Sequence, residues 1–226
     1  MTDRPILFSG PMVRALLDGR KTQTRRLCKD QPPPGVTIIR KTIRPFGKEP
    51  YHAFERRTKF GNFGGEVPVK ISRGDRLWVK ETHARVGDNG DDHMACPDLT
   101  RLVYYRADDV QPELSRWRPS IFMRRQDSRL TLLVTDVRVE RLQDITNEDC
   151  IAEGVPVHPN ENAPRVGPTQ DAFAREHGLI SHYGASYRRV WEDINGNGSW
   201  DDNPWVAAYS FRVIKQNIDQ IEKVAA

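Results

Sequence analysis

The sequence predicts an α+β fold: a small β-barrel with short flanking helices and long loop insertions. Three observations indicate this class. Several runs are rich in β-branched and aromatic residues, the helical patterns are few and short, and stretches dense in Pro and Gly separate them. Non-sequential antiparallel strands with few helices favour a barrel, because closure removes exposed sheet edges.

The first expected element is a short helix over residues 9–18. Ser9 is the candidate N-cap, Pro11 fits the first turn, and Gly19 is placed to end the helix. One apolar stripe supports it and contains Met12, Val13, Leu16 and Leu17. The basic segment GRKTQTRR, residues 19–26, therefore begins where this helix stops.

Four strands are expected further along the chain. They are predicted within 74–81, where a turn leads into the strand, and over 102–107, 130–139 and 205–214. Two more helices are expected. In the first, Thr146 and Asp149 have the spacing of a capping box and Gly154 ends the helix. The second covers the run ASYRRVWEDI at 185–194.

The remaining segments lack a lasting period and contain many turn residues. We interpret residues 28–70, 86–128 and 155–190 as insertions in a single domain that spans residues 1–226, and we expect a loop rather than core over 28–70.

Composition limits the class of protein. No apolar run approaches the roughly 20 residues of a membrane span, and the N-terminus lacks the apolar stretch of a signal peptide. Cys28, Cys96 and Cys150 are odd in number and far apart, so we expect reduced thiols and a cytoplasmic protein. A net charge of +4 permits nucleic-acid or nucleotide binding without requiring it.

Metal sites are not expected, and neither is a cofactor. The run that starts at Asp193 matches the first half of an EF-hand loop, but Pro204 occupies the position of the bidentate acid. The spacing of His83, His93 and Cys96 matches no closed zinc site. We read the first segment as a turn before the last strand, and the second group as ordinary surface or loop residues.

The segment GRKTQTRR has two interpretations. Arg25 and Arg26 suit a clamp for phosphate, which would bind without chemistry. Alternatively, Lys21 is a base that activates the Thr24 hydroxyl, which requires desolvation or nearby cations to depress the lysine pKa. Arg20 adds to those cations. A distant acid, Glu153, falls in the last turn of a short helix, where a carboxylate is disfavoured by roughly 0.3–1 kcal/mol.

A second basic segment, WRPSIFMRR at 117–125, places aromatic rings among arginines. Trp117 and Phe122 can stack on bases while the arginines hold phosphates, or they can pin a loop to the core. Both readings remain open on the sequence alone.

The pattern G-R-K-T-x-T-x-R at 19–26, G-D-x-L-x-V at 74–79 and I-T…E from 145 to 153 resembles the ASCH superfamily of PUA-like β-barrels. It is most similar there to the N4-acetylcytidine amidohydrolases. The wider superfamily has an acid where this chain has Thr24, and that replacement points to the amidohydrolase branch. Segments like 117–123 and 203–206 also occur in long ASCH-domain proteins of phages and prophages.

The resemblance implies an activity and a catalytic trio. It implies an enzyme that removes an acetyl or other acyl group from N4 of cytidine or a related modified pyrimidine nucleoside, with Lys21, Thr24 and Glu153 as catalytic residues. Substrate-binding residues would be Arg25, Arg26, Trp78 and Trp117. Characterised members of that branch are shorter and lack most of the three insertions, so the fold transfers more readily than the substrate.

Other functions fit the same residues. The chain could be an ASCH module that binds RNA or single-stranded DNA without catalysis, through the basic cluster and Trp117. It could also be a ribonuclease of the ASCH type, in which Lys21 and the arginines stabilise a phosphorane. Within the hydrolase reading, Glu153 could instead activate a water directly, which leaves Thr24 as a binding group.

Overall fold

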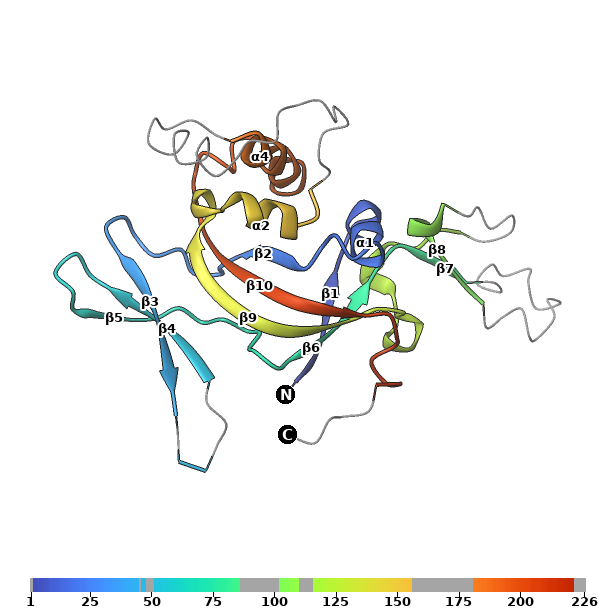
Figure 1. Ribbon diagram of the computed structural model, residues 1–226, viewed down its shortest axis with the longest axis horizontal. Helices are drawn as coiled ribbons and strands as arrows, with labels where there is room; N and C mark the ends of the chain where they lie inside the picture. The colour runs from blue at the N-terminus through green and yellow to red at the C-terminus, as the bar shows by residue number, and fades with distance from the viewer. Residues whose placement is uncertain are drawn as a thin grey trace. The chain divides into compact units, whose positions relative to one another are not determined.

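The computed structural model describes residues 2–44, 46–47, 51–85, 102–109, 116–155 and 181–221. Within these ranges it mixes several strands with a few helices, which confirms the predicted α+β class (Figure 1). The helices are α1 Gly10–Leu17, α2 Asn147–Ala152 and α4 His182–Asn195, with 3-10 turns η3 Arg106–Asp108, η4 Ser120–Phe122, η5 Arg125–Asp127 and η6 Leu142–Asp144. The strands are β1 Asp3–Leu7, β2 Gln23–Leu27, β3 Thr37–Ile43, β4 Tyr51–Arg57, β5 Phe63–Glu66, β6 Arg76–Lys80, β7 His83–Arg85, β8 Val103–Tyr105, β9 Thr131–Arg141 and β10 Trp205–Ile214.

The chain divides into two compact units. Unit 1 comprises the described residues within 1–19, 74–134 and 211–226, and unit 2 those within 20–73 and 135–210. The two long strands β9 and β10 run through both units. The sequence predicts a single domain with three insertions, and the division into two units does not test that prediction.

The largest sheet has five strands in the order β1-β6-β9-β10-β2. β1 runs parallel to β6, β6 runs antiparallel to β9, and β2 runs antiparallel to β10 with Thr24 opposite Tyr209. β1 and β2 are the ends of this order, and no pairing joins them among the described strands. Closure into a barrel therefore stays a prediction.

Helix α1 ends where the sequence predicts. Gly19 has a φ of +74°, which an L side chain rarely adopts, and its N–H donates to the Leu16 carbonyl at 3.1 Å. Ser9 occupies the N-cap position, but its side chain makes no capping hydrogen bond. Pro11 in the first turn lacks the N–H that would otherwise need a partner there, which favours the helix start.

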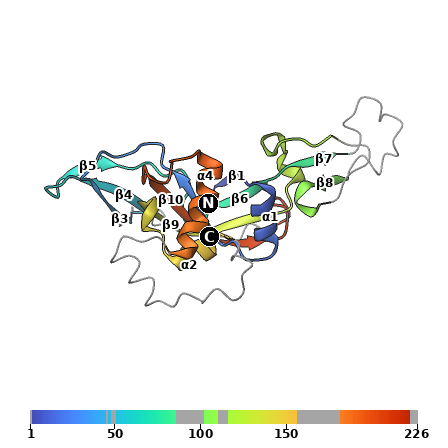
Figure 2. The ribbon, with the colours of Figure 1, turned by 90° about the horizontal axis from the view of Figure 1, so that it is seen from above.

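Unit 2 has an aromatic core beneath its two helices. The Tyr187 ring from α4 has its centroid 6.4 Å from that of Trp191, also in α4, and 6.2 Å from that of Trp200. The buried cluster comprises Leu142, Ile145, Cys150, Val155, Tyr187, Trp191, Trp200 and Val206. α2 and α4 lie side by side in both ribbon views (Figures 1 and 2). This packing fixes α2, which ends at the residue that the sequence singles out as a candidate acid.

The segment 28–70 differs from the expected loop. It contains the three-stranded antiparallel sheet β3-β4-β5, in which Thr37 lies opposite Arg57 and Ile43 opposite Tyr51. β3 contributes no fully buried residue, so it lacks the apolar alternation that predicts a strand. The segments 86–128 and 155–190 are described only in part.

Two further predictions concern thiols and membranes. Cys28 and Cys150 are buried and neither belongs to a disulfide, whereas Cys96 lies outside the described residues. Burial raises the pKa of the Cys28 thiol to about 11. Within the described ranges, no helix has the length and apolar character that a bilayer crossing requires.

Candidate active site

Lys21 and Glu153 meet although 132 positions separate them. The chain leaves α1 at Gly19, and Lys21 then forms an isolated antiparallel bridge with Glu153 before β2 begins at Gln23. The N–H of Thr22 donates to the Ala152 carbonyl at 2.8 Å, which extends the same contact by one residue. The start of β2 is thereby attached to the end of α2 within unit 2.

The local sequence explains why Glu153 lies at the end of α2. Thr146 and Asp149 form the predicted capping box: the Thr146 side chain accepts from the Asp149 N–H, and the Asp149 carboxylate accepts from the Thr146 N–H. Glu153, seven residues after Thr146, is the C-cap, and Gly154, at a φ of +76°, turns the chain away. The helix is fixed at both ends by its own sequence.

Lys21 is enclosed and donates twice to one residue. Its Nζ lies 2.8 Å from the Glu153 carboxylate oxygen Oε2 and 2.8 Å from the Glu153 main-chain carbonyl. The exposed fraction of the Lys21 side chain is 0%, and that of the Glu153 side chain is 4%. A lysine is almost never this buried unless it is paired, so the site has a specific structural or chemical reason to exist.

Burial lowers the pKa of Lys21 below its usual value. Glu153 opposes this shift by favouring the ammonium, whereas the cations Arg26 and Arg25 support it. The net direction is that required of a lysine that must lose its proton. The predicted cause, desolvation together with neighbouring cations, therefore agrees with the direction of this shift.

Arg25 connects Glu153 to two further acids. Its Nη1 lies 3.2 Å from the second Glu153 oxygen, Oε1, and its Nη2 lies 2.6 Å from Glu140 and 2.8 Å from Asp149. The guanidinium is buried, and its Nε has no hydrogen-bond partner. Each oxygen of Glu153 thus has a different cation, Lys21 or Arg25. Arg25 is held inside the protein rather than displayed as a phosphate clamp.

Three residues of this cluster, Gln23, Arg138 and Glu140, were not singled out from the sequence. Gln23 and Arg138 both bond to the Asp149 oxygen Oδ1, at 3.0 Å and 2.7 Å, and Glu140 lies 3.5 Å from Arg138. Burial opposes ionisation of Asp149, but Arg25 and Arg138 outweigh it and hold the Asp149 pKa below its ordinary value. The capping box identifies Asp149 as a cap, but no local signal marks its second role. Gln23, Arg138 and Glu140 are single polar residues in strand-forming runs.

Thr24 lies inside β2 and is buried, with an exposed fraction of 3%. Lys21 precedes this strand, so the two residues do not belong to one regular strand with its two-residue alternation. Within the described part of the chain, no side-chain hydrogen bond engages the Thr24 hydroxyl. A catalytic pair of Lys21 and Thr24 stays a prediction.

The predicted substrate-binding residues fall in different units. Arg25 and Arg26 belong to unit 2, and burial lowers the pKa of Arg26. Trp78 and Trp117 belong to unit 1, where each ring has a cation over it: Lys80 Nζ at 5.3 Å from Trp78, and the Arg106 guanidinium at 5.3 Å from Trp117. A role for these tryptophans in substrate binding stays a prediction.

Phe122 does not anchor its loop. It is 65% exposed, while the adjacent Met123 is buried. The prediction that Phe122 pins the loop 117–125 to the core is therefore wrong.

The structure describes some of the residues that the sequence offers as candidate metal ligands. Among the described residues, no group of three or more His, Cys, Asp or Glu side chains could hold a metal ion. The EF-hand-like run begins in the last turn of α4, and Gly196 and Gly198 with positive φ make the predicted turn before β10. Of the candidate zinc residues, His83 is buried in β7, and His93 and Cys96 lie outside the described ranges.

Comparisons of this chain with models of protein families, with curated proteins and with solved structures find no match.

Proposed function

We propose that this protein is an amidohydrolase that removes an acyl group, such as acetyl, from N4 of cytidine or a related modified pyrimidine nucleoside. The observation that carries the proposal is the contact between Lys21 and Glu153, a buried amine and a carboxylate 2.8 Å apart. The same contact is required by the resemblance to N4-acetylcytidine amidohydrolases. Closure of the five-stranded sheet into a PUA-like barrel and a cytoplasmic location belong to the same proposal.

The first chemical step uses Lys21 as a base. A threonine hydroxyl is a weak nucleophile until its proton is taken, and a neutral amine can take it. Burial lowers the Lys21 pKa, so the amine loses its own proton more easily than a lysine in water. Lys21 Nζ accepts the Thr24 proton while the Thr24 oxygen bonds to the acyl carbon.

The next step needs donors for the tetrahedral oxyanion. The N–H groups of Gly19 and Thr22 already bond to the carbonyls of Leu16 and Ala152, so they are unsuited to this role. The guanidinium of Arg26 is the donor that we propose. The C–N bond then breaks, the proton held by Lys21 passes to the departing N4, and cytidine leaves with its amino group restored. Water releases the acyl group from Thr24 as a carboxylic acid.

In this proposal Glu153 governs where the Lys21 proton resides. Its Oε2 accepts from Lys21 while its Oε1 accepts from Arg25, so both oxygens are already paired. When Lys21 becomes an ammonium during the reaction, this carboxylate stabilises it. In the alternative mechanism Glu153 takes a proton from water and Thr24 only binds substrate. Trapping an acylated Thr24 by mass spectrometry would support the covalent route.

The test is acetate release from N4-acetylcytidine by the purified protein. We expect Lys21→Ala, Thr24→Ala and Glu153→Gln each to lower kcat/KM by at least about a hundred-fold, the range for loss of a general base. Thr22→Ala is the matched control. Thr22 is an exposed threonine in the same segment, and it contacts α2 only through its backbone N–H, which the substitution keeps. Its activity should equal that of the wild type.

Single-stranded RNA in a parallel reaction separates the rival functions. Strand cleavage that depends on Lys21, without acetate release, would replace the proposal with a ribonuclease. If neither reaction occurs and RNA is bound, the protein is a binding module. Acetate release that persists in Glu153→Gln would show that Glu153 is not a catalytic residue.

A further inference from the structure

One face of the sheet β3-β4-β5 has exposed side chains toward its ends, whereas Ala53 and Glu55 on the same face are buried. Side chains alternate between the two faces of a strand, and residues paired across strands share a face. The pairs Ile43–Tyr51, Ile39–Glu55 and Arg57–Phe63 therefore lie on the same side. We call this side the outer face; its residues are Thr37, Ile39, Lys41, Ile43, Tyr51, Ala53, Glu55, Arg57, Phe63 and Glu66.

The opposite face is the one that joins this sheet to the rest of unit 2. Arg40 pairs with Asp136 at 2.8 Å and donates to the Val137 carbonyl at 3.2 Å, both in β9. Phe54, which lies opposite Arg40, is 4% exposed. The outer face consequently points away from β9.

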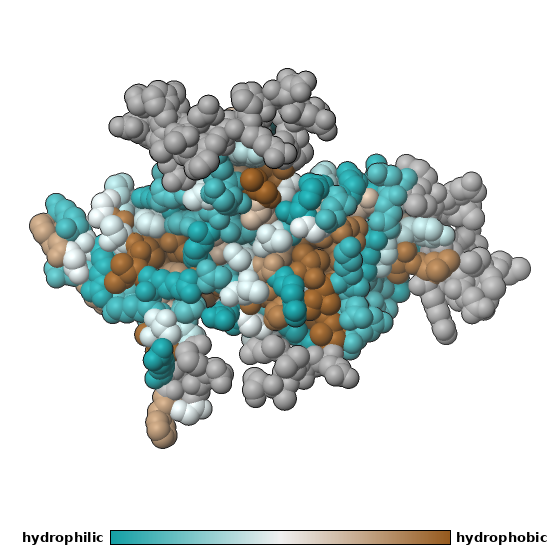
Figure 3. All heavy atoms as spheres, in the orientation of Figure 1, coloured by the Kyte–Doolittle hydropathy of each residue, from teal (hydrophilic) through white to brown (hydrophobic). Residues whose placement is uncertain are grey.

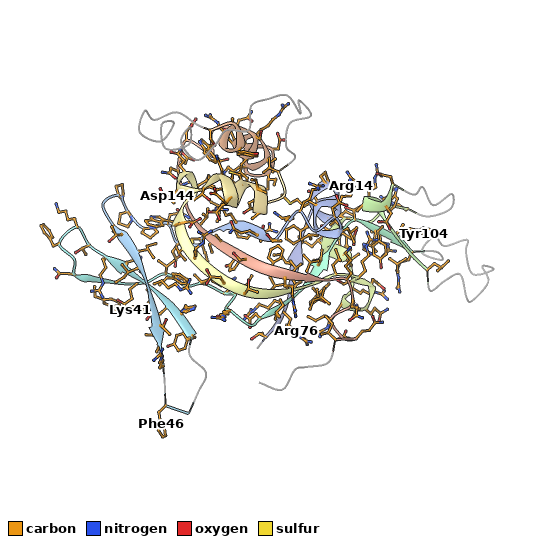
Figure 4. The ribbon with its side chains drawn as sticks, viewed as in Figure 1. Arg14, Lys41, Phe46, Arg76, Tyr104 and Asp144 are labelled. Atoms are coloured by element: carbon orange, nitrogen blue, oxygen red, sulfur yellow. The ribbon has the colours of Figure 1, made fainter. Side chains whose placement is uncertain are left out.

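Aromatic rings are displayed on the outer face. Tyr51 is 51% exposed and Phe63 is 60% exposed, while Phe60 in the β4–β5 turn is 78% exposed. Figure 3 shows hydrophobic and hydrophilic residues mixed over this region, and Figure 4 places Lys41 on the sheet and Phe46 at the far end of the β3–β4 connection. Tyr51 begins β4 and Phe63 pairs with Arg57 at the end of β4, so the exposed rings lie toward the two ends of the outer face.

The charge of the outer face indicates what it binds. Lys41 Nζ and Arg57 Nη2 both contact one oxygen, Oε2 of Glu55, at 2.8 Å and 2.6 Å. Two cations that converge on a single carboxylate oxygen can receive a phosphate oxygen in the same way. Around them the described residues of 37–66 contain more cations than acids: Arg40, Lys41, Arg44, Arg56, Arg57 and Lys59 against Glu55 and Glu66.

We propose that the outer face of β3-β4-β5 binds single-stranded nucleic acid, with bases stacked on Tyr51 and Phe63 and phosphate oxygens bound by Lys41 and Arg57. Rings on a sheet, interleaved with cations, suit unpaired bases because every base has a π-face, and a duplex hides those faces. Glu55 holds the two cations in position when no nucleic acid is bound, and it competes with the phosphate. This proposal does not depend on the amidohydrolase chemistry.

The experiment is fluorescence anisotropy of labelled oligo(U) and oligo(dT), with a labelled duplex for comparison, at several salt concentrations. The two single-stranded arms distinguish RNA from DNA as the preferred ligand. Tyr51→Ala and Phe63→Ala should each weaken binding by about five- to a hundred-fold, the range for loss of one stacked base. Lys41→Ala should reduce the salt dependence by about one unit of slope.

Two variants make the test specific. Glu55→Gln should strengthen binding, because it removes the competing charge while keeping a side chain of the same size. Ile194→Ala in α4 is the control, since it removes an apolar side chain that is 54% exposed and lies outside this sheet; binding should be unchanged. Circular dichroism checks that each variant is folded.

Several outcomes would overturn the proposal. They are no saturable binding of either single strand, equal binding of duplex, binding that does not change in Tyr51→Ala and Phe63→Ala, or a loss in Ile194→Ala as large as theirs. Acetate release from free N4-acetylcytidine, measured on the same variants, should stay at the wild-type rate. Failure of the binding surface therefore leaves the hydrolase proposal standing, and failure of hydrolysis leaves the binding surface standing.

Discussion

Both units contain a buried acid paired with a cation, Glu153 in unit 2 and Glu81 in unit 1, and these two pairs differ in the cation. In unit 2, Lys21 donates to Glu153 and is wholly enclosed. In unit 1, Arg129 binds both oxygens of Glu81, at 2.9 Å and 3.0 Å, while 23% of the Arg129 side chain remains exposed. Arg129 also bonds to Asp108 at 2.8 Å and lies over the Tyr105 ring at 3.9 Å.

The chemistry of the two cations separates their roles. Burial disfavours the Arg129 cation, but hydrogen bonds from Arg129 to Glu81 and Asp108 outweigh that effect and raise its pKa, so Arg129 keeps its charge. The Lys21 pKa moves in the opposite direction because burial dominates there. A guanidinium fork fixes geometry, whereas a desolvated amine can exchange a proton. The unit 1 pair is built to hold two segments together, and the unit 2 pair is suited to move a proton.

The largest expected effect comes from breaking the unit 2 pair on one side. Lys21→Met leaves Glu153 buried without its amine, which costs about 3 kcal/mol of unfolding free energy, the lower end for a broken buried pair because Arg25 still contacts Glu153. Urea unfolding measures this cost. The double variant Lys21→Met with Glu153→Leu should recover part of the stability and none of the activity. A double variant less stable than Lys21→Met would contradict the explanation that the unpaired, buried Glu153 carboxylate causes the loss of stability.

A smaller effect is expected from weakening the unit 1 pair. Arg129→Lys keeps the charge but loses one branch of the fork, so we expect a loss of about 1.5–3 kcal/mol, the range for a hydrogen bond to a charged group. The measurement is again urea unfolding. Acetate release below the unfolding transition should match the wild type. A large drop in the rate for folded Arg129→Lys would show that the two pairs are not separate in function.

The pH dependence of stability sharpens the contrast further. Lys21 has an ordinary pKa of about 10.5 when the chain is unfolded and a lower pKa when it is folded. Between those two values the unfolded chain binds the extra proton, so the free energy of unfolding rises with pH by up to about 1.4 kcal/mol per pH unit. Urea titrations at a series of pH values test this, and Lys21→Met should lose the rise. Identical slopes in both proteins would refute the lowered pKa.

The smallest effect concerns the cap that positions Glu153. Thr146→Ala removes the side chain that accepts from the Asp149 N–H, which should cost about 1 kcal/mol. Thr146→Ser retains the hydroxyl and should lie within a few tenths of a kcal/mol of the wild type. Thermal unfolding of the two variants checks this difference. Equal melting temperatures would mean that packing against α4, not the cap, fixes α2.

Elements that carry a local signal could be predicted from the sequence. The apolar stripe before Gly19 marks α1, the capping-box residues Thr146 and Asp149 mark α2, and the β-branched runs mark β9 and β10. These features depend on neighbours a few residues apart, so a single segment contains the whole signal. The sheet β3-β4-β5 was missed because exposed residues interrupt its alternation, and its outer face displays polar and apolar side chains together.

The candidate site was predictable only in its parts. The cation-rich turn and the oddly placed Glu153 stand out in the sequence, but their proximity came from the resemblance to a family and not from any pattern across 132 positions. The contribution of Glu140 and Arg138 had no signal, because a charged residue in a strand is usually solvated. Pairings between distant segments depend on the tertiary fold, which local propensity does not encode.

Complete enclosure of the Lys21 amine has a practical consequence for chemical labelling. Reagents that modify amines act on accessible, deprotonated nitrogen, so in the native protein they should pass over residue 21 and react with exposed lysines such as Lys41. Modification at residue 21 would then record openings of the segment that separate it from Glu153. The buried lysine is therefore a built-in reporter of local opening, readable by mass spectrometry without any added probe.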